Sequence, residues 1–198
     1  MRAAEWKRLT IAEVKRTGAE WKYSKALAYV APVDWVVHGV FGEGSGRSAG
    51  EFYVWRVQLP LMVPQDGVVA LTWSDRVGGA STTYSEDSRD LAAVISLAAS
   101  EALWHSRAGS VLVEPPGGAD SLRMQEARAY GFVIQGNVAN ASELLRRIGN
   151  YNLTYPWEME LLERTKAIAS LLQSARLDSA MQQLKVWRGE NCEALGLR

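Results

Sequence analysis

The spacing of apolar residues changes character along the chain, and this change limits the possible folds more than any other sequence feature. Between residues 20 and 75, apolar and polar side chains alternate in short stretches, as they do on β-strands with one face in water. From residue 83 onward, apolar residues recur every three or four positions, as on amphipathic helices. The sequence therefore predicts an α+β fold with a β-rich front half and a helical back half.

The front half is predicted to hold four strands, each with one tryptophan. We expect them over residues 21–29, 35–41, 51–59 and 67–73, with Trp21, Trp35, Trp55 and Trp73. The links between them are short or rich in glycine, above all residues 42–50, whereas parallel neighbours need crossovers of about a dozen residues or more. We therefore predict a four-stranded antiparallel meander, preceded by an N-terminal helix over residues 3–17.

The back half is predicted to be helical. A covering helix is expected from Thr83, which with Glu86 fits a capping box, to about Arg107. The clearest linker is Glu-Pro-Pro-Gly-Gly at 114–118. After it, helical spacing predicts four helices, at about 120–135, 138–148, 156–174 and 178–189. We expect residues 1–114 to form the sheet with its helices, and residues 119–198 a helical subdomain packed on it in one compact unit.

Composition narrows the class of function. The 198 residues include 22 basic and 22 acidic side chains, and a net charge of zero argues against nucleic acid as the main partner. No apolar run approaches the roughly 18 residues that a membrane span needs. The single cysteine, Cys192, suits a reducing compartment. These features predict a cytoplasmic protein without membrane contact.

No sequence motif for catalysis or cofactor binding is complete in this chain. The glycine-rich stretch 42–50 leads from strand to strand, whereas phosphate-binding loops lead into a helix. The two histidines have structural explanations, because His38 lies in an apolar strand and His105 near a helix C-terminus. Neither belongs to a metal-ligand spacing or a nucleophile motif. We therefore expect no catalytic residues, no cofactor and no metal.

Acidic residues gather in the middle of the chain. Residues 31–119 carry ten acidic and five basic side chains. Several of these acids stand at predicted loops or element ends, where binding residues usually lie, and an acidic surface steers a basic partner. The sequence thus predicts a protein partner, held by Glu43, Asp66, Asp75, Glu86, Asp87 and Asp90.

Three segments carry a resemblance to a known class of protein. They are the strand Phe-Tyr-Val-Trp-Arg-Val at 52–57, the strand end Trp73–Arg76, and the helix with Ala141, Leu144 and Leu145. With the order of helix, meander, covering helix and helical tail, the chain resembles several families of small bacterial immunity proteins. Those proteins are cytoplasmic antidotes that bind and neutralise polymorphic toxins. The resemblance covers most of the chain as a pattern of elements, and it implies a protein-binding inhibitor.

Two other classes of function stay open on the sequence. One is a small-ligand-binding or enzymatic domain with a pocket between sheet and helices. The other is a structural or adaptor subunit that uses the helical tail. A pocket lined by His38 and acids would favour the former, and a large apolar patch on residues 156–189 would favour the latter.

Overall fold

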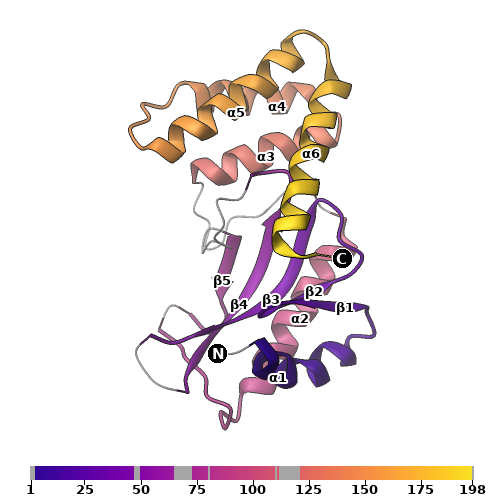
Figure 1. Ribbon diagram of the computed structural model, residues 1–198, viewed down its shortest axis with the longest axis vertical. Coiled ribbons are helices and arrows are strands. Elements are labelled where there is room, and N and C mark those ends of the chain that lie inside the picture. Colours follow the sequence, from indigo (N-terminus) through magenta and orange to yellow (C-terminus); the bar gives the residue numbers. More distant parts are fainter. Residues whose placement is uncertain are drawn as a thin grey trace. The chain divides into compact units, whose positions relative to one another are not determined.

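The computed structural model describes residues 3–46, 50–64, 73–79, 81–109, 111 and 121–197. Within these ranges the chain is α+β, with a five-stranded antiparallel sheet and six helices (Figure 1). It divides into two compact units. The first comprises Met1–Leu59, Val69–Ser110 and Ala194–Arg198, and the second comprises Pro60–Val68 and Val111–Glu193. The predicted linker at 114–118 lies outside the described residues.

The sheet is a meander in which each strand pairs with its neighbour in sequence. Its strands are β1 (Trp21–Ser24), β2 (Leu27–Val30), β3 (Val36–Gly44), β4 (Phe52–Pro60) and β5 (Ser74–Arg76), in the order β1-β2-β3-β4-β5. The predicted antiparallel topology is confirmed. The predicted number of strands is wrong, because the structure has five in place of four.

The extra strand arises because residues 21–29 fold as a hairpin. Ser24 pairs with Leu27, so only two residues form the turn, and Lys25 adopts a positive φ of 52° there. Tight two-residue hairpins require such left-handed backbone conformations. The turn also changes which side chains share a face of the sheet. Tyr23 pairs with Ala28, so these two lie on the same face, and Tyr29 lies on the other.

The helix that covers the sheet begins later than the sequence predicts. α2 runs over Leu91–Arg107, and residues 81–90 form turns and a bridge to the sheet. The backbone of Tyr84 exchanges hydrogen bonds of 2.8 and 2.9 Å with that of Phe52. The Thr83 hydroxyl donates to Glu51 at 2.9 Å, so it does not cap the helix. Most of the predicted strand 67–73 lies outside the described residues.

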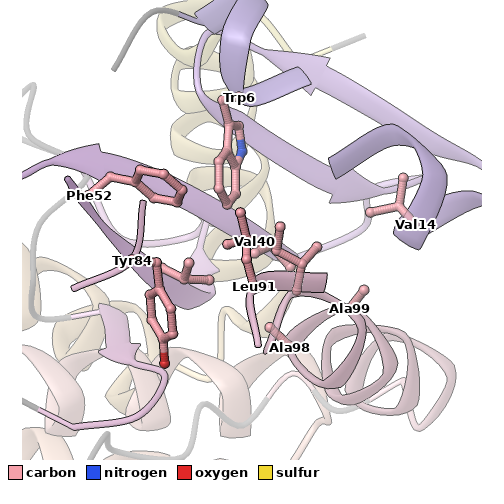
Figure 2. Close-up of a cluster of buried hydrophobic side chains, with 10 residues drawn as sticks. Trp6, Val14, Val40, Phe52, Tyr84, Leu91, Ala98 and Ala99 are labelled. Atoms are coloured by element: carbon pink, nitrogen blue, oxygen red, sulfur yellow. The ribbon is translucent and has the colours of Figure 1, made fainter. Parts of the chain in front are cut away.

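Two helices pack on one face of the sheet and enclose the core of the first unit. α1 (Ala3–Arg16) contributes Trp6, whose ring meets Phe52 edge-on with centroids 6.1 Å apart. Figure 2 shows both rings beside Val40 and Leu91. Close approach of α1 depends on Gly42, because a Cβ atom there would lie 2.5 Å from the Trp6 ring.

The second unit contains four helices, each close to a helix that the sequence predicts. Its helices are α3 (Leu122–Ile134), α4 (Val138–Gly149), α5 (Pro156–Gln173) and α6 (Leu177–Leu195). The α5 N-terminus has proline at its first position, and the Glu158 carboxylate accepts hydrogen bonds from the backbone N–H groups of Thr154 and Tyr155. Within the described ranges, no helix combines the length and the apolarity needed to cross a bilayer.

A buried ion pair joins α3 to α5 inside this unit. The Glu126 side chain is fully buried, and Arg164 donates to its two oxygens at 3.0 and 3.1 Å. The Tyr130 hydroxyl donates to the same carboxylate at 3.0 Å. Burial raises the pKa of Glu126 and outweighs the opposing effect of Arg164. The cluster satisfies its own polar groups, so we interpret it as structural.

Candidate functional site: the exposed face of α2

One face of α2 leaves large apolar side chains in solvent. Its opposite side is buried in the core through Leu91, Ile95, Ala98, Ala99 and Ala102. On the outer side, Leu97 is 54% exposed and Trp104 is 65% exposed. The two are seven positions apart, which is about two helical turns, so they lie on the same face. We call this face, formed by Ala93, Leu97, Ser100 and Trp104, the α2 stripe.

The α2 stripe has no charged side chain, and its polar group already has a hydrogen-bond partner. The only Asp, Glu, Lys or Arg side chains in α2 are Glu101 and Arg107. The Ser100 hydroxyl donates to the Ser96 carbonyl at 2.8 Å, so the helix itself satisfies that hydrogen bond. Large apolar side chains that share one exposed face are typical of interaction surfaces. The stripe therefore has the character of an interface.

The N-terminal end of α2 is acidic, and it holds three of the six predicted binding residues. Glu86, Asp87 and Asp90 are exposed in the turns that lead into the helix, where the helix dipole favours negative charge. Glu86 forms an ion pair with Arg8 of α1. Among the residues that the structure describes, Asp87 and Asp90 form no ion pair, so their charges stay available to a partner.

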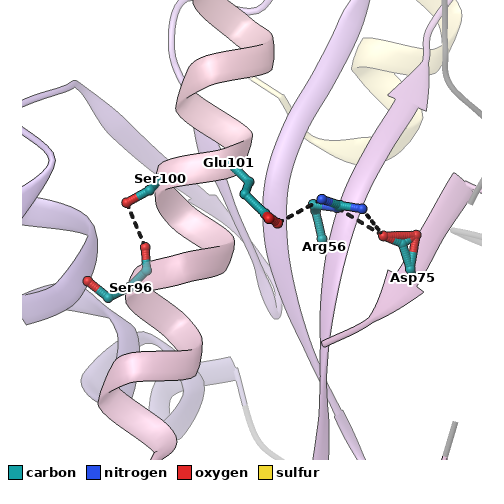
Figure 3. Close-up of polar contacts among 5 residues, drawn as sticks. All are labelled: Arg56, Asp75, Ser96, Ser100 and Glu101. Atoms are coloured by element: carbon teal, nitrogen blue, oxygen red, sulfur yellow. Dashed lines mark hydrogen bonds and ion pairs between the residues drawn. The ribbon is translucent and has the colours of Figure 1, made fainter. Parts of the chain in front are cut away.

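A fourth predicted residue, Asp75, takes part in an ion cluster that fixes α2 to the sheet (Figure 3). Arg56 of β4 lies opposite Asp75 of β5 and donates to its carboxylate, with Nε at 2.9 Å. The Arg56 Nη1 atom donates to Glu101 of α2 at 2.7 Å. Burial lowers the pKa of Arg56, but the two carboxylates outweigh it and raise that pKa overall. Asp75 is thus a positioning residue rather than a free charge.

The other predicted acids do not join this group. Glu43 of β3 lies on the opposite face of the sheet from Asp75, where it accepts a hydrogen bond of 3.0 Å from the Trp55 indole N–H. Trp55 also lies under the Arg76 guanidinium, 4.6 Å from the ring centroid. Asp66 lies outside the described residues. Glu86, Asp87 and Asp90 therefore lie together at one end of α2. Asp75 is linked to the side of that helix, and Glu43 lies apart from the other four.

The two histidines support the C-terminal end of the α2 stripe. The rings of His38 and His105 are nearly parallel, with centroids 6.0 Å apart, and Trp104 packs edge-on against His105 at 4.7 Å. Burial, with a smaller effect of His105, lowers the pKa of His38 from 6.5 to about 4. His38 is therefore neutral at pH 7, and its role in this stack is packing.

The described residues give no support to a metal site or to a reactive thiol. Within the described ranges, no three His, Cys, Asp or Glu side chains come together as metal ligands would. Burial raises the pKa of the Cys192 thiol, which disfavours the reactive thiolate. Sequence reasoning missed Leu97 and Trp104, although the shortage of charge between residues 91 and 107 was a signal for them.

No protein-family model, curated protein or solved structure matches this chain.

Proposed function

We propose that this chain is a protein-binding inhibitor of the bacterial immunity type, which neutralises a basic toxin domain by direct binding through α2. The observation that carries the proposal is the exposure of Leu97 and Trp104 on one uncharged helical face, next to the acidic residues Asp87 and Asp90. An apolar centre with charge at its margin is the usual anatomy of a protein interface.

The α2 stripe supplies the anchoring contact. Tryptophan is enriched among the few interface residues that carry most of the binding energy, and Trp104 presents its ring at the surface. The ring is already held against His105, so little side-chain freedom is lost on binding. Leu97, two turns away, extends the apolar area. Together they fit a groove or a shallow apolar depression on the partner.

The acidic end supplies partner selection. Asp87 and Asp90 place their charge just before the first turn of α2, and surface charge of one sign accelerates the approach of a partner of the opposite sign. The partner predicted by this surface is a basic domain. Arg56, through Asp75 and Glu101, holds the helix that presents these charges.

The test begins with the partner bound in the native host. Tagged wild-type chain and a variant with Leu97→Ala and Trp104→Ala are used to recover partners after cross-linking, and the purified partner is then measured by surface plasmon resonance. We expect the double variant to bind about thirtyfold more weakly, because a tryptophan hot spot contributes about 2 kcal/mol. The matched control is Val186→Ala, an exposed apolar residue of the second unit.

Charge reversal tests the acidic end separately. Asp87→Lys with Asp90→Lys should slow association about tenfold at low ionic strength, and the difference should shrink as salt rises. Glu163→Lys, an exposed acid on α5, is the control. If neither double variant changes binding, the α2 interface is wrong. If binding behaves as expected but the purified partner does not harm bacteria that lack this chain, the partner is not a toxin and the immunity assignment fails.

A further inference from the structure

A hollow of about 350 Å³ lies in the first unit, away from the α2 stripe, between α1 and β1. Its helical side is formed by Lys7, Ile11, Val14 and Lys15, and its strand side by Trp21 and Tyr23. The volume falls at the lower end of the range of about 300–1,000 Å³ that small-molecule sites occupy. We infer that this hollow is a binding site for a planar aromatic anion, meaning an aromatic ring that bears a carboxylate or phosphate group.

The two aromatic rings of the hollow are held in place before any ligand arrives. The Trp21 indole N–H donates to the Thr17 hydroxyl at 2.8 Å. The hydroxyl groups of Tyr23 and Thr10 lie 3.3 Å apart and share a hydrogen bond. Because the polar end of each ring has a partner, each ring keeps one orientation in the wall of the hollow, and a fixed aromatic wall favours a flat aromatic ligand.

Two lysines give the hollow its charge. Lys7 and Lys15 are eight residues apart on α1, about 12 Å along the helix axis, with Ile11 midway between them. Within the described part of the chain neither forms an ion pair, whereas Arg8, Arg16 and Lys22 each pair with a glutamate. The Lys7 ammonium lies over the Tyr23 ring, 5.2 Å from its centroid, so a charge and a ring stand together in the wall of the hollow.

This combination selects the ligand by its chemistry. A neutral aromatic molecule would leave both ammonium groups unused, and an inorganic anion would leave the rings of Trp21 and Tyr23 unused. A planar aromatic anion stacks on a ring and pairs with an ammonium group at once. The rest of the N-terminal region agrees in sign, since residues 1–30 carry seven basic and three acidic side chains.

The experiment compares a charged probe with its neutral counterpart. Naphthoate and naphthamide share one ring system and differ in charge, and both are titrated into the full chain by isothermal calorimetry. We expect naphthoate to bind wild type about fivefold more tightly than naphthamide. Lys7→Met together with Lys15→Met should remove that preference. Either lysine alone can hold one carboxylate, so both are changed together.

The controls separate the hollow from the rest of the surface. Trp21 and Tyr23 lie on one face of β1, toward the hollow, and Lys22 lies on the other. Lys22→Met should therefore leave naphthoate binding unchanged. Ile11→Trp should fill the hollow and weaken both probes. The α2 variants Leu97→Ala and Trp104→Ala should have no effect, so this inference can fail independently of the proposed function. Equal affinity of the two probes for wild type, or an undiminished preference after the double lysine change, would overturn it.

Discussion

Protonation of His38 should make the first unit acid-sensitive. The imidazole is 7% exposed, and its pKa is lowered from 6.5 to about 4 by burial and, to a smaller degree, by His105. Between those two pH values the unfolded chain binds a proton at this residue and the folded chain does not. The free energy of unfolding therefore falls as the pH drops through that window. Above pH 6.5 this loss is absent, and the free energy of unfolding keeps its full value with respect to His38.

The size of the effect follows from the two pKa values. From pH 7.5 to pH 5 the folded state should lose about 2 kcal/mol through His38 alone, and at pH 4 about 3 kcal/mol. Other groups titrate over the same range, so a variant is needed to isolate this one. His38→Phe keeps a ring against His105 but cannot bind a proton.

Urea unfolding at several pH values provides the measurement. The wild-type free energy of unfolding should fall by about 2 kcal/mol more than that of the His38→Phe variant between pH 7.5 and 5. The matched control is His105→Gln, which removes only the smaller influence on His38 and should keep most of the pH dependence. If His38→Phe and wild type lose stability in parallel on acidification, the lowered pKa of His38 is refuted.

Three further substitutions test the packing of the two units by urea unfolding. Arg164→Met should cost about 3–5 kcal/mol because it leaves the buried Glu126 carboxylate without its cation, and a double variant that also carries Glu126→Gln should recover part of this loss; equal stability of both would contradict the buried pair. Asn191→Leu should cost about 1–3 kcal/mol, because the amide donates to two backbone carbonyls at 2.7 and 2.8 Å; a neutral result would mean that water replaces it. Gly42→Ala should cost about 1–3 kcal/mol by pushing against the Trp6 ring, and an unchanged free energy would show that the helix shifts freely.

The sequence by itself determined the class of fold, because local spacing reports local structure. Helical periodicity located α3 to α6 within a few residues, apart from the C-terminal end of α6, and the proline at position 156 marked the start of α5. Alternation and short links were enough to predict an antiparallel meander. These features depend on neighbours within a few positions of the chain, where propensity and pattern agree.

Only the tertiary structure decided how the strands divide. The turn at Lys25 uses a left-handed conformation at a residue that gives no sequence signal for it, and pairing of Ser24 with Leu27 holds it there. In the same way, Tyr84 is held by the edge of β4 instead of joining α2. At Tyr84 a contact distant in sequence overrode the local preference, whereas at Lys25 the pairing of β1 with β2 did so.

The candidate site depended on tertiary structure most of all. A list of acids along the chain cannot tell that Glu43 and Asp75 lie on opposite faces of the sheet, or that Asp75 is already paired with Arg56. Nor can helical spacing tell which apolar face stays in water. Leu97 and Ile95 are both ordinary apolar residues of one helix, and only packing against the sheet buries the second and leaves the first exposed. Exposure is set by what covers a residue, and what covers it comes from distant parts of the chain.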